Sequence, residues 1–328
     1  MTSTLLVTGA SGFIGSHVTR AARDAGWRVV ALVRPTTERA GRASFEGETR
    51  AGDLRDEKSL ERALEGVDAV VHLAGLTRAK SRKEFFDANA GGVARLVRAA
   101  RRTAPRLKRF VYVSSLAAGG PSLDGRPVRE DDPPRPVSDY GRSKLAGEEE
   151  LRREAGELPW TIVRPPIVYG PEERDLFEIF KAARGGFVPV VGSGAERYSI
   201  LHGEDLARLL VSTLGRERGA GKIYYAAEPD TYTHRELIGH CAAAVGATPR
   251  LLPVPRWLAC VVAAGGSAVA PFRRRPPLIT LGKLPEVLAP GWTCDASAAA
   301  RDFDFAPRYR LPEGARATAD WYREKGWL

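Results

Sequence analysis

Tyr140 and Lys144 lie four positions apart in DYGRSKLAG, a segment with the composition of a helix. Positions i and i+4 share one helix face, so both side chains can enter the same cleft. A free tyrosine titrates near pH ~10, and a neighbouring ammonium group lowers that pKa by stabilising the phenolate. The pair therefore predicts a phenol that exchanges a proton with an alcohol or carbonyl oxygen. Composition alone gives such spacing in about one chain in four, so other motifs must support it.

A glycine-rich turn, TGASGFIG at residues 8–15, follows a short apolar segment and opens a segment of helical period. Gly9 permits the tight turn, Gly12 lets the backbone approach a pyrophosphate, and Gly15 allows close contact between helix and strand. Free N–H groups at the start of a helix also favour phosphate. The turn therefore predicts dinucleotide binding, with a purely structural glycine turn as the alternative.

Arg34, in ALVRPTTER, bears on which dinucleotide binds. An NAD site usually places Asp or Glu about 20 residues after the glycines, where the carboxylate binds the ribose 2′-hydroxyl. A guanidinium group at that place can instead hold a 2′-phosphate with two hydrogen bonds. We therefore expect NADP to be preferred over NAD. In the alternative, NAD binds and Arg34 is only a solvated residue at the end of a strand.

Short apolar segments alternate with helical ones through the first half of the chain. Strands are expected at 3–10, 28–33, 49–54, 68–75, 109–115 and 160–165, and helices at 13–27, 56–66, 82–102 and 138–154. Apolar strands separated by helices indicate right-handed βαβ units. The fold class is therefore α/β, a doubly wound parallel sheet of the Rossmann type.

Proline and paired glycines interrupt this rhythm after Pro165 and indicate a smaller substrate-binding region. The dinucleotide-binding domain is expected to cover 1–168. Residues 196–230 return to it through a helix at 203–215 and a strand at 221–227. The substrate-binding region is then formed by 169–195 and 231–328.

Motifs along the chain resemble the extended branch of the short-chain dehydrogenase/reductase superfamily, the NAD-dependent epimerase/dehydratase proteins. They are TGASGFIG at 8–15, GDL at 52–54, VHLAG at 71–75, Asn89 in DANAGG, VYVSS at 111–115, YGRSK at 140–144 and RPPIVYGP at 164–171. The resemblance covers nearly all of the first domain and thins after residue 230. It implies a nicotinamide-dependent enzyme with Tyr140 as general acid or base.

The resemblance also implies roles for individual residues. Ser115, five residues before Gly120 as in relatives, would hydrogen-bond the reacting oxygen in place of Ser114. Lys144 would also hold the nicotinamide ribose. Asn89 would support a water-linked proton relay, or is simply a polar helix residue. The coenzyme would be bound by Gly9, Ser11, Gly12, Phe13, Ile14, Gly15, Arg34, Asp53, Leu54, Leu73, Ala74, Gly75, Tyr140, Lys144 and Pro165.

Three functions compete: hydride transfer to or from a carbonyl or alcohol, sugar-nucleotide epimerisation, and silent dinucleotide sensing. The presence of Ser115, Tyr140 and Lys144 together argues against the silent protein. The residues after Ser115, in SSLAAGGP, lack the acids of sugar dehydratases and resemble dihydroflavonol reductases and 3β-hydroxysteroid dehydrogenases. We favour an oxidoreductase acting on a small hydrophobic substrate. Epimerisation stays the alternative, because Arg197 matches one of the two residues of a pattern whose arginine binds a nucleotide phosphate in epimerases.

Bulk composition limits the partners. The net charge of +10 and the pI of about 9.7 come from residues spread along the chain without interleaved aromatic residues, so no nucleic-acid partner is expected. Three distant cysteines and an N-terminus without a secretory pattern favour the cytoplasm. The histidines have no metal-ligand spacing, so no metal is assigned. By resemblance the chain could form a homodimer through the Tyr140 helix.

Two further segments have structural interpretations. The carboxylates at 147–151 are expected on a solvated helix face. The apolar run 257–272, followed by RRR at 273–275, is expected to be a core or pocket-lining helix. Membrane contact through 257–275, as an interfacial anchor, is the less favoured alternative.

Overall fold

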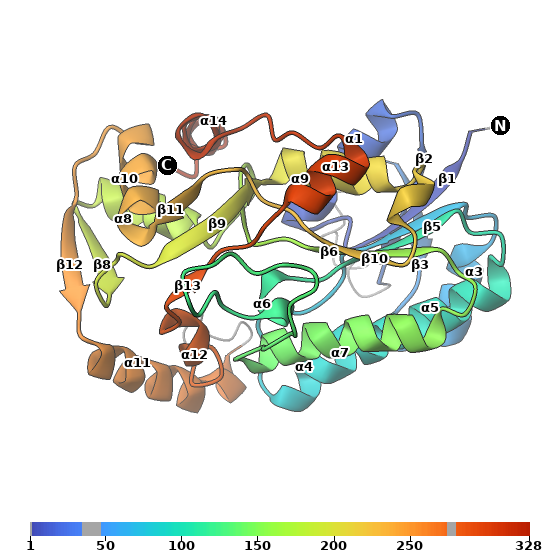
Figure 1. Ribbon diagram of the computed structural model, residues 1–328, viewed down its shortest axis with the longest axis horizontal. Coiled ribbons are helices and arrows are strands. Elements are labelled where there is room, and N and C mark those ends of the chain that lie inside the picture. Colours follow the sequence, from blue (N-terminus) through green and yellow to red (C-terminus); the bar gives the residue numbers. More distant parts are fainter. Residues whose placement is uncertain (1, 35–46, 274–279) are drawn as a thin grey trace.

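A computed structural model describes residues 2–34, 47–273 and 280–328, and a seven-stranded sheet forms its larger part (Figure 1). The strands are β1 (Thr4–Thr8), β2 (Arg28–Val33), β3 (Glu48–Ala51), β4 (Ala69–His72), β5 (Arg109–Val113), β6 (Trp160–Arg164) and β10 (Lys222–Tyr225). All six pairings are parallel, in the order β10-β6-β5-β4-β1-β2-β3. The doubly wound Rossmann fold is confirmed, and its direction of winding reverses between β1 and β4, where such sheets bind ligands.

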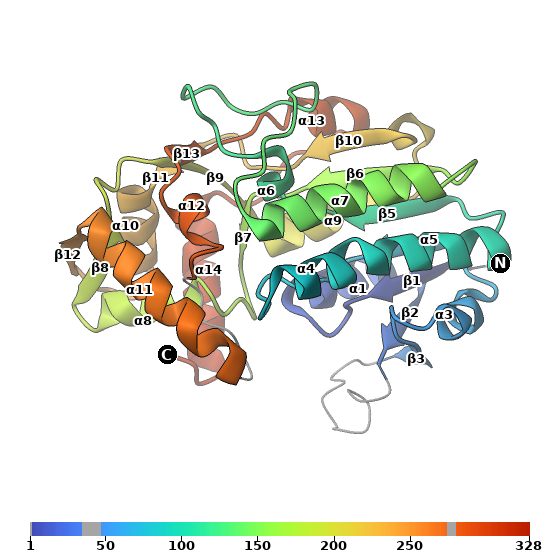
Figure 2. The same ribbon diagram turned by 90° about the horizontal axis from the view of Figure 1, so that it is seen from below.

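Helices cover both faces of this sheet (Figure 2). One face carries α3 (Glu57–Leu64), α4 (Arg82–Asn89), α5 (Gly91–Thr103) and α7 (Asp139–Glu154), and the other carries α1 (Phe13–Asp24), α9 (Gly203–Thr213) and α13 (Ser297–Phe303). Side chains of β1 alternate between the two cores: Leu5 and Val7 pack towards α1 and α9, and Leu6 packs towards α3 and α5. Strands buried on both faces explain why their sequences are apolar throughout.

The helix predicted over 82–102 is two helices. It breaks at Ala90, which has φ −105° and ψ −55°, immediately before Gly91 and Gly92. Adjacent glycines weaken a helix, because they lose the most backbone freedom when it forms. The break ends α4 at Asn89, next to the candidate site.

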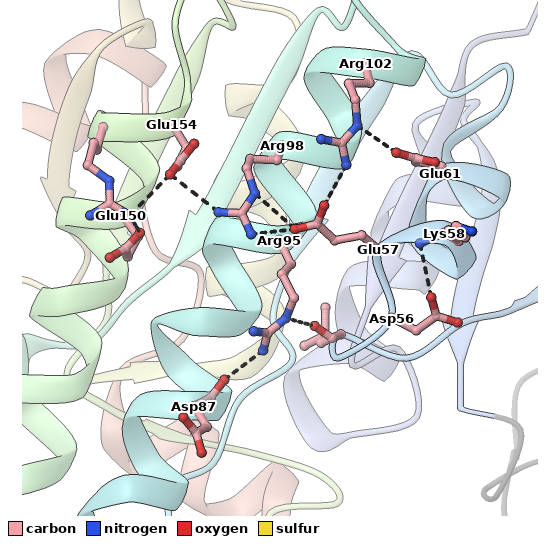
Figure 3. A network of polar contacts seen from close by, with 12 residues as sticks. Asp56, Glu57, Lys58, Glu61, Asp87, Arg95, Arg98, Arg102, Glu150 and Glu154 are labelled. Carbon is pink, nitrogen blue, oxygen red and sulfur yellow. Dashed lines mark hydrogen bonds and ion pairs between the residues drawn. The ribbon is translucent and has the colours of Figure 1, made fainter.

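Arginines of α5 bind the neighbouring helices on the outer side (Figure 3). Arg98 pairs with Glu57 of α3 and lies 3.4 Å from Glu154 of α7. Arg102 lies 2.7 Å from both Glu57 and Glu61. Partly exposed pairs of this kind contribute about 1 kcal/mol or less each, so they mainly keep the three helices in register.

A second region packs beside the carboxyl ends of the strands. Its strands are β7 (Ile167–Tyr169), β9 (Arg197–His202), β11 (Thr231–Thr233) and β13 (Gly291–Trp292) in one sheet, and β8 (Phe187–Val191) with β12 (Arg250–Val254) in another. Its helices are α8 (Phe177–Arg184), α10 (His234–Ala244), α11 (Arg256–Val269), α12 (Leu284–Val287) and α14 (Leu311–Glu324). Short helical turns complete the described chain: α6 (Leu116–Gly119), η1 (Glu217–Gly219) and η2 (Ala270–Phe272).

The apolar run 257–272 is not a core helix. It forms α11 and η2, in which Trp257, Val261 and Phe272 are 66%, 58% and 89% exposed. In the part of the chain that the structure describes, no helix is long and apolar enough to cross a membrane.

Candidate active site

The glycine turn packs against the chain that leaves β4. Gly9 has φ +74°, and a Cβ there would lie 2.9 Å from the backbone nitrogen of Ala74. A Cβ at Gly15 would lie 2.1 Å from the carbonyl oxygen of Gly9, so only glycine fits. Gly12 is the N-cap of α1 and offers no side-chain cap, and the first turn of α1 carries no acidic residue. This helix start therefore offers N–H groups and positive potential to a phosphate.

Arg34, Asp53 and Leu54 lie beyond the carboxyl ends of β2 and β3, at the same edge of the sheet. Gly52 donates its N–H to the carbonyl of Val33 at 3.0 Å, which places the chain of Asp53 beside that of Arg34. The Arg34 side chain is exposed. Asp53 Oδ1 accepts the N–H of Arg55 at 2.9 Å. The exposed Arg34 therefore follows the end of β2 beside the chain at Asp53.

A buried histidine fixes the chain at 73–75. His72 Nδ1 lies 2.7 Å from Thr8 Oγ1, and Thr8 Oγ1 accepts the N–H of Ala74 at 3.1 Å. Burial, with a smaller effect of the Lys144 charge, lowers the pKa of His72 to about 3. His72 is therefore neutral and holds the ends of β1 and β4 together beneath Leu73, Ala74 and Gly75.

Asn89 holds the next turn against α7. Its Oδ1 accepts the N–H of Leu76 at 2.7 Å, and its Nδ2 donates to the Leu76 carbonyl and to Ser143 Oγ, both at 2.9 Å. A Cβ on Gly75 would lie 2.7 Å from Asn89 Oδ1 and 4.0 Å from Lys144 Nζ. The Asn89 amide is thus engaged in positioning bonds. A water-linked relay through this residue stays a prediction.

Tyr140 and Lys144 both leave α7 towards the segment that follows β5. Lys144 Nζ donates to the carbonyl of Val113 at 2.7 Å and lies 4.5 Å from the centre of the Tyr112 ring. Burial lowers the pKa of Lys144 to about 7, and the Glu148 carboxylate opposes this shift. Its ammonium group is therefore directed to the end of β5.

The expected lowering of the Tyr140 pKa by Lys144 is wrong for this structure. Burial raises the pKa of Tyr140 to about 12; a hydrogen bond with Ser115 opposes this and the Glu286 carboxylate adds to it. The i, i+4 spacing places both residues on one helix face, but it does not determine which group the flexible lysine side chain binds. Here the Lys144 Nζ is bound to a backbone carbonyl.

Ser115, not Ser114, faces the phenol. Ser115 caps α6 by accepting the N–H of Ala117 at 3.1 Å and also bonds with Tyr140. Ser114 Oγ instead donates to Glu148 Oε1 at 2.6 Å. The N–H of Leu116 donates to the Pro165 carbonyl at 2.8 Å, which brings the end of β6 beside the pair.

Glu148 corrects the expectation of a solvated face at 147–151. Its side chain is fully buried and receives two bonds from Arg164, from Nε at 2.8 Å and from Nη2 at 2.7 Å. Arg164 Nη1 also donates to Tyr225 Oη at 2.9 Å. A signal existed in the sequence: Tyr140, Lys144 and Glu148 follow one another at intervals of four on the same helix face.

Sequence reasoning also missed Lys283. Its Nζ lies 5.1 Å from the centre of the Tyr140 ring and 2.8 Å from Glu286 Oε2. Glu286 in turn accepts a hydrogen bond from Ser138 Oγ, one residue before α7. The segment at 280–287 therefore closes over Tyr140. Nothing in the local sequence of LGKLPEV indicates this, because the contact is made only by the tertiary fold.

Comparisons with known proteins show what this chain is similar to. A family model described as "NAD dependent epimerase/dehydratase family" matches residues 5–227. The ceramide reductase of Caulobacter vibrioides is 34% identical over 324 residues, covering 98% of this chain and 95% of that protein. Sterol demethylase protein B of Methylococcus capsulatus is 30% identical over 353 residues, covering 99% and 100%. The solved structure of MoeE5 with UDP-glucuronic acid and NAD has a TM-score of 0.77 at 28% identity, covering 98% of this chain and all of that one (100%).

Proposed function

Because the chain belongs to the NAD-dependent epimerase/dehydratase family, in the extended short-chain dehydrogenase/reductase group, we propose that it is a reductase of a hydrophobic, lipid-like ketone. The observation that carries this proposal is the Ser115–Tyr140 pair, followed in the chain by the buried apolar residues Leu116, Ala117 and Ala118. No acid follows Ser115 there to drive a dehydration. Relatives named for ceramide and sterol chemistry support the substrate class.

The residues present fit a nicotinamide dinucleotide. The turn from Gly9 to Gly15 has the space and the free N–H groups for a pyrophosphate, Asp53 and Leu54 would meet the adenosine, and Lys144 would hold the nicotinamide ribose. When bound, the coenzyme supplies or accepts the hydride. We further propose that 1–168 and 196–230 serve the coenzyme and that 169–195 and 231–328 serve the substrate, with α13 packed on the sheet.

Tyr140 is suited to donating a proton. With a pKa of about 12, its phenol carries the proton at neutral pH, so it can protonate the oxygen of a carbonyl as that oxygen gains negative charge. Ser115 Oγ orients the same oxygen by a hydrogen bond. Reduction leaves the Tyr140 phenolate behind and alcohol oxidation starts from it, so the same group serves both directions of the reaction.

A substrate screen tests the proposal. Consumption of NADPH and NADH would be followed with long-chain 3-keto lipids, sterol ketones and aromatic ketones, and UDP-sugars would be analysed separately for epimers. Net coenzyme oxidation with a ketone supports a reductase. Interconversion of a UDP-sugar without net oxidation would replace it with epimerisation, the alternative that the UDP-glucuronic acid complex of MoeE5 keeps open.

Lys144 should give the reaction a pH dependence. Its folded pKa is lowered from 10.5 to about 7, so the ammonium form exists below that value and is lost as the pH rises through it. Because kcat/KM reports groups of the free enzyme, we expect kcat/KM to fall above about pH 7. Lys144→Arg keeps its charge and should lack this limb. An unchanged limb in that variant would contradict the assignment.

Arg34 should set the choice of coenzyme. We propose a preference for NADP, supported by the exposed guanidinium group at the end of β2. Loss of one charge-assisted phosphate contact is expected to lower kcat/KM for NADPH by roughly 10-fold in Arg34→Ala and to leave that for NADH unchanged. Arg55→Ala, an exposed arginine nearby, is the control. A wild-type preference for NADH would remove this proposal.

A further inference from the structure

The exposed apolar side chains of the described residues gather in one place. Among the residues that the structure describes, ten large hydrophobic side chains are exposed, and all of them except Leu123 lie within 187–281. Six form what we call the α11 surface: Trp257, Leu258, Val261, Val262, Val269 and Phe272. In both views α11 lies at the outer edge of the second region (Figures 1 and 2). Contiguous apolar surface of this kind marks an interaction site.

Helix α11 exposes its large apolar side chains and buries its small ones. A surface helix normally turns its large apolar side chains to the core. On α11 the buried residues are Ala259 and Ala263, at 3% and 0% exposure, while Trp257 and Val261 are 66% and 58% exposed. Small residues thus attach the helix to the protein, and its large apolar residues need a partner outside the chain.

The surrounding charge favours an anionic partner. Residues 237–285 contain no Asp or Glu. Arg256 and Arg273 are exposed just at the two ends of the α11 surface. Two copies of this chain related by a twofold axis would bring such like charges together. An apolar band between cations matches acyl chains below anionic headgroups.

The length of the helix sets the mode of binding. Its 14 residues span about 21 Å, less than the ~30 Å hydrocarbon layer of a bilayer. Among the described residues there is no membrane-spanning helix. A helix of this length with one apolar face lies in the plane of the interface.

We propose that α11 binds the surface of an anionic lipid bilayer, with its large apolar side chains among the acyl chains and Arg256 and Arg273 at the phosphates. The segment at 281–283 connects α11 to the candidate site. Ser267 Oγ on α11 accepts the N–H of Leu281 at 2.8 Å, and the same segment carries Lys283 over Tyr140. Delivery of a lipid substrate along this path rests on the proposed function, whereas membrane binding does not.

Sedimentation with vesicles tests the proposal on the full chain. We expect binding to vesicles of phosphatidylglycerol and phosphatidylcholine, and at least 10-fold weaker binding to phosphatidylcholine alone, because the arginines lose their counter-charges. Val261→Asp with Val262→Asp should weaken binding to the anionic vesicles at least 10-fold. Leu123→Asp, also at an exposed apolar residue but outside the α11 surface, should bind as the wild type. Thermal unfolding of both variants should match the wild type, because the replaced side chains are exposed.

Three results would overturn the proposal. They are no wild-type binding to the anionic vesicles, equal binding by the Val261/Val262 variant, and a wild-type dimer in light scattering that the same variant dissociates. Reduction of a short, water-soluble ketone without vesicles reports the proposed function separately. Failure of docking leaves that activity intact, and failure of the reductase proposal leaves vesicle binding intact.

Discussion

Tyr140→Phe should lower kcat by roughly 100- to 10,000-fold, the usual contribution of a positioned general acid. The phenol is the titratable group that bonds with Ser115. The partly buried ring stays in contact with Phe85, at 6.1 Å between centroids, and beneath Lys283. The variant should therefore fold and melt like the wild type. Steady-state kinetics and thermal unfolding measure the two expectations.

Tyr309→Phe is the matched control, since it removes one hydroxyl, bonded to Glu204 at 3.2 Å, far along the chain from α7. Its kcat should stay near the wild-type value. Coenzyme binding, measured by the fluorescence of reduced nicotinamide, should persist in Tyr140→Phe because the glycine turn is unchanged. Normal turnover by Tyr140→Phe would refute the acid role and leave binding of the dinucleotide as the main function.

The parallel sheet was predictable because its strands are buried on both faces. The run RVVALV forms β2 with the predicted bounds, 28–33. Branched apolar side chains favour a strand that is buried on both faces. The predicted helix at 82–102 failed at Ala90, where a local glycine pair outweighs the apolar period. Periodicity identifies the faces of a helix but not a break within it.

The site residues that belong to local sequence motifs could be predicted. The contacts between residues far apart in the sequence, and the burial of charged side chains, could not. Glu148 shared its face with Tyr140, yet a carboxylate among glutamates was assigned to solvent because charge is normally exposed. The partner that permits its burial, Arg164, comes from another element. The exposure of α11 was missed for the opposite reason: apolar composition predicts burial, and only tertiary structure shows which side of a helix is covered.

Glu148→Ala should lower the free energy of unfolding by about 3–5 kcal/mol, the cost of leaving a buried charge without its partner. Arg164 is 2% exposed in its side chain and has Tyr225 as its other bonding group, so water cannot replace the carboxylate. Ser114 loses its acceptor as well. The pKa of Lys144 should fall further, since the Glu148 charge is the group that raises it. The pH limb of kcat/KM should then move to lower pH.

Urea unfolding of five variants measures this prediction: Glu148→Ala, Glu150→Ala, Glu148→Leu, Arg164→Met and the double variant of the last two. Glu150→Ala is the control, because its partly exposed pair with Arg153 should contribute about 1 kcal/mol or less. Glu148→Leu combined with Arg164→Met removes both charges and should recover part of the loss, since an apolar pair of similar volume avoids the desolvation of two ions. If Glu148→Ala costs no more than Glu150→Ala, the buried pair does not stabilise the fold. If the double variant is instead as unstable as the sum of its single changes, the two side chains act independently, and the ends of β6 and α7 must be held beside Ser115 by the surrounding apolar packing alone.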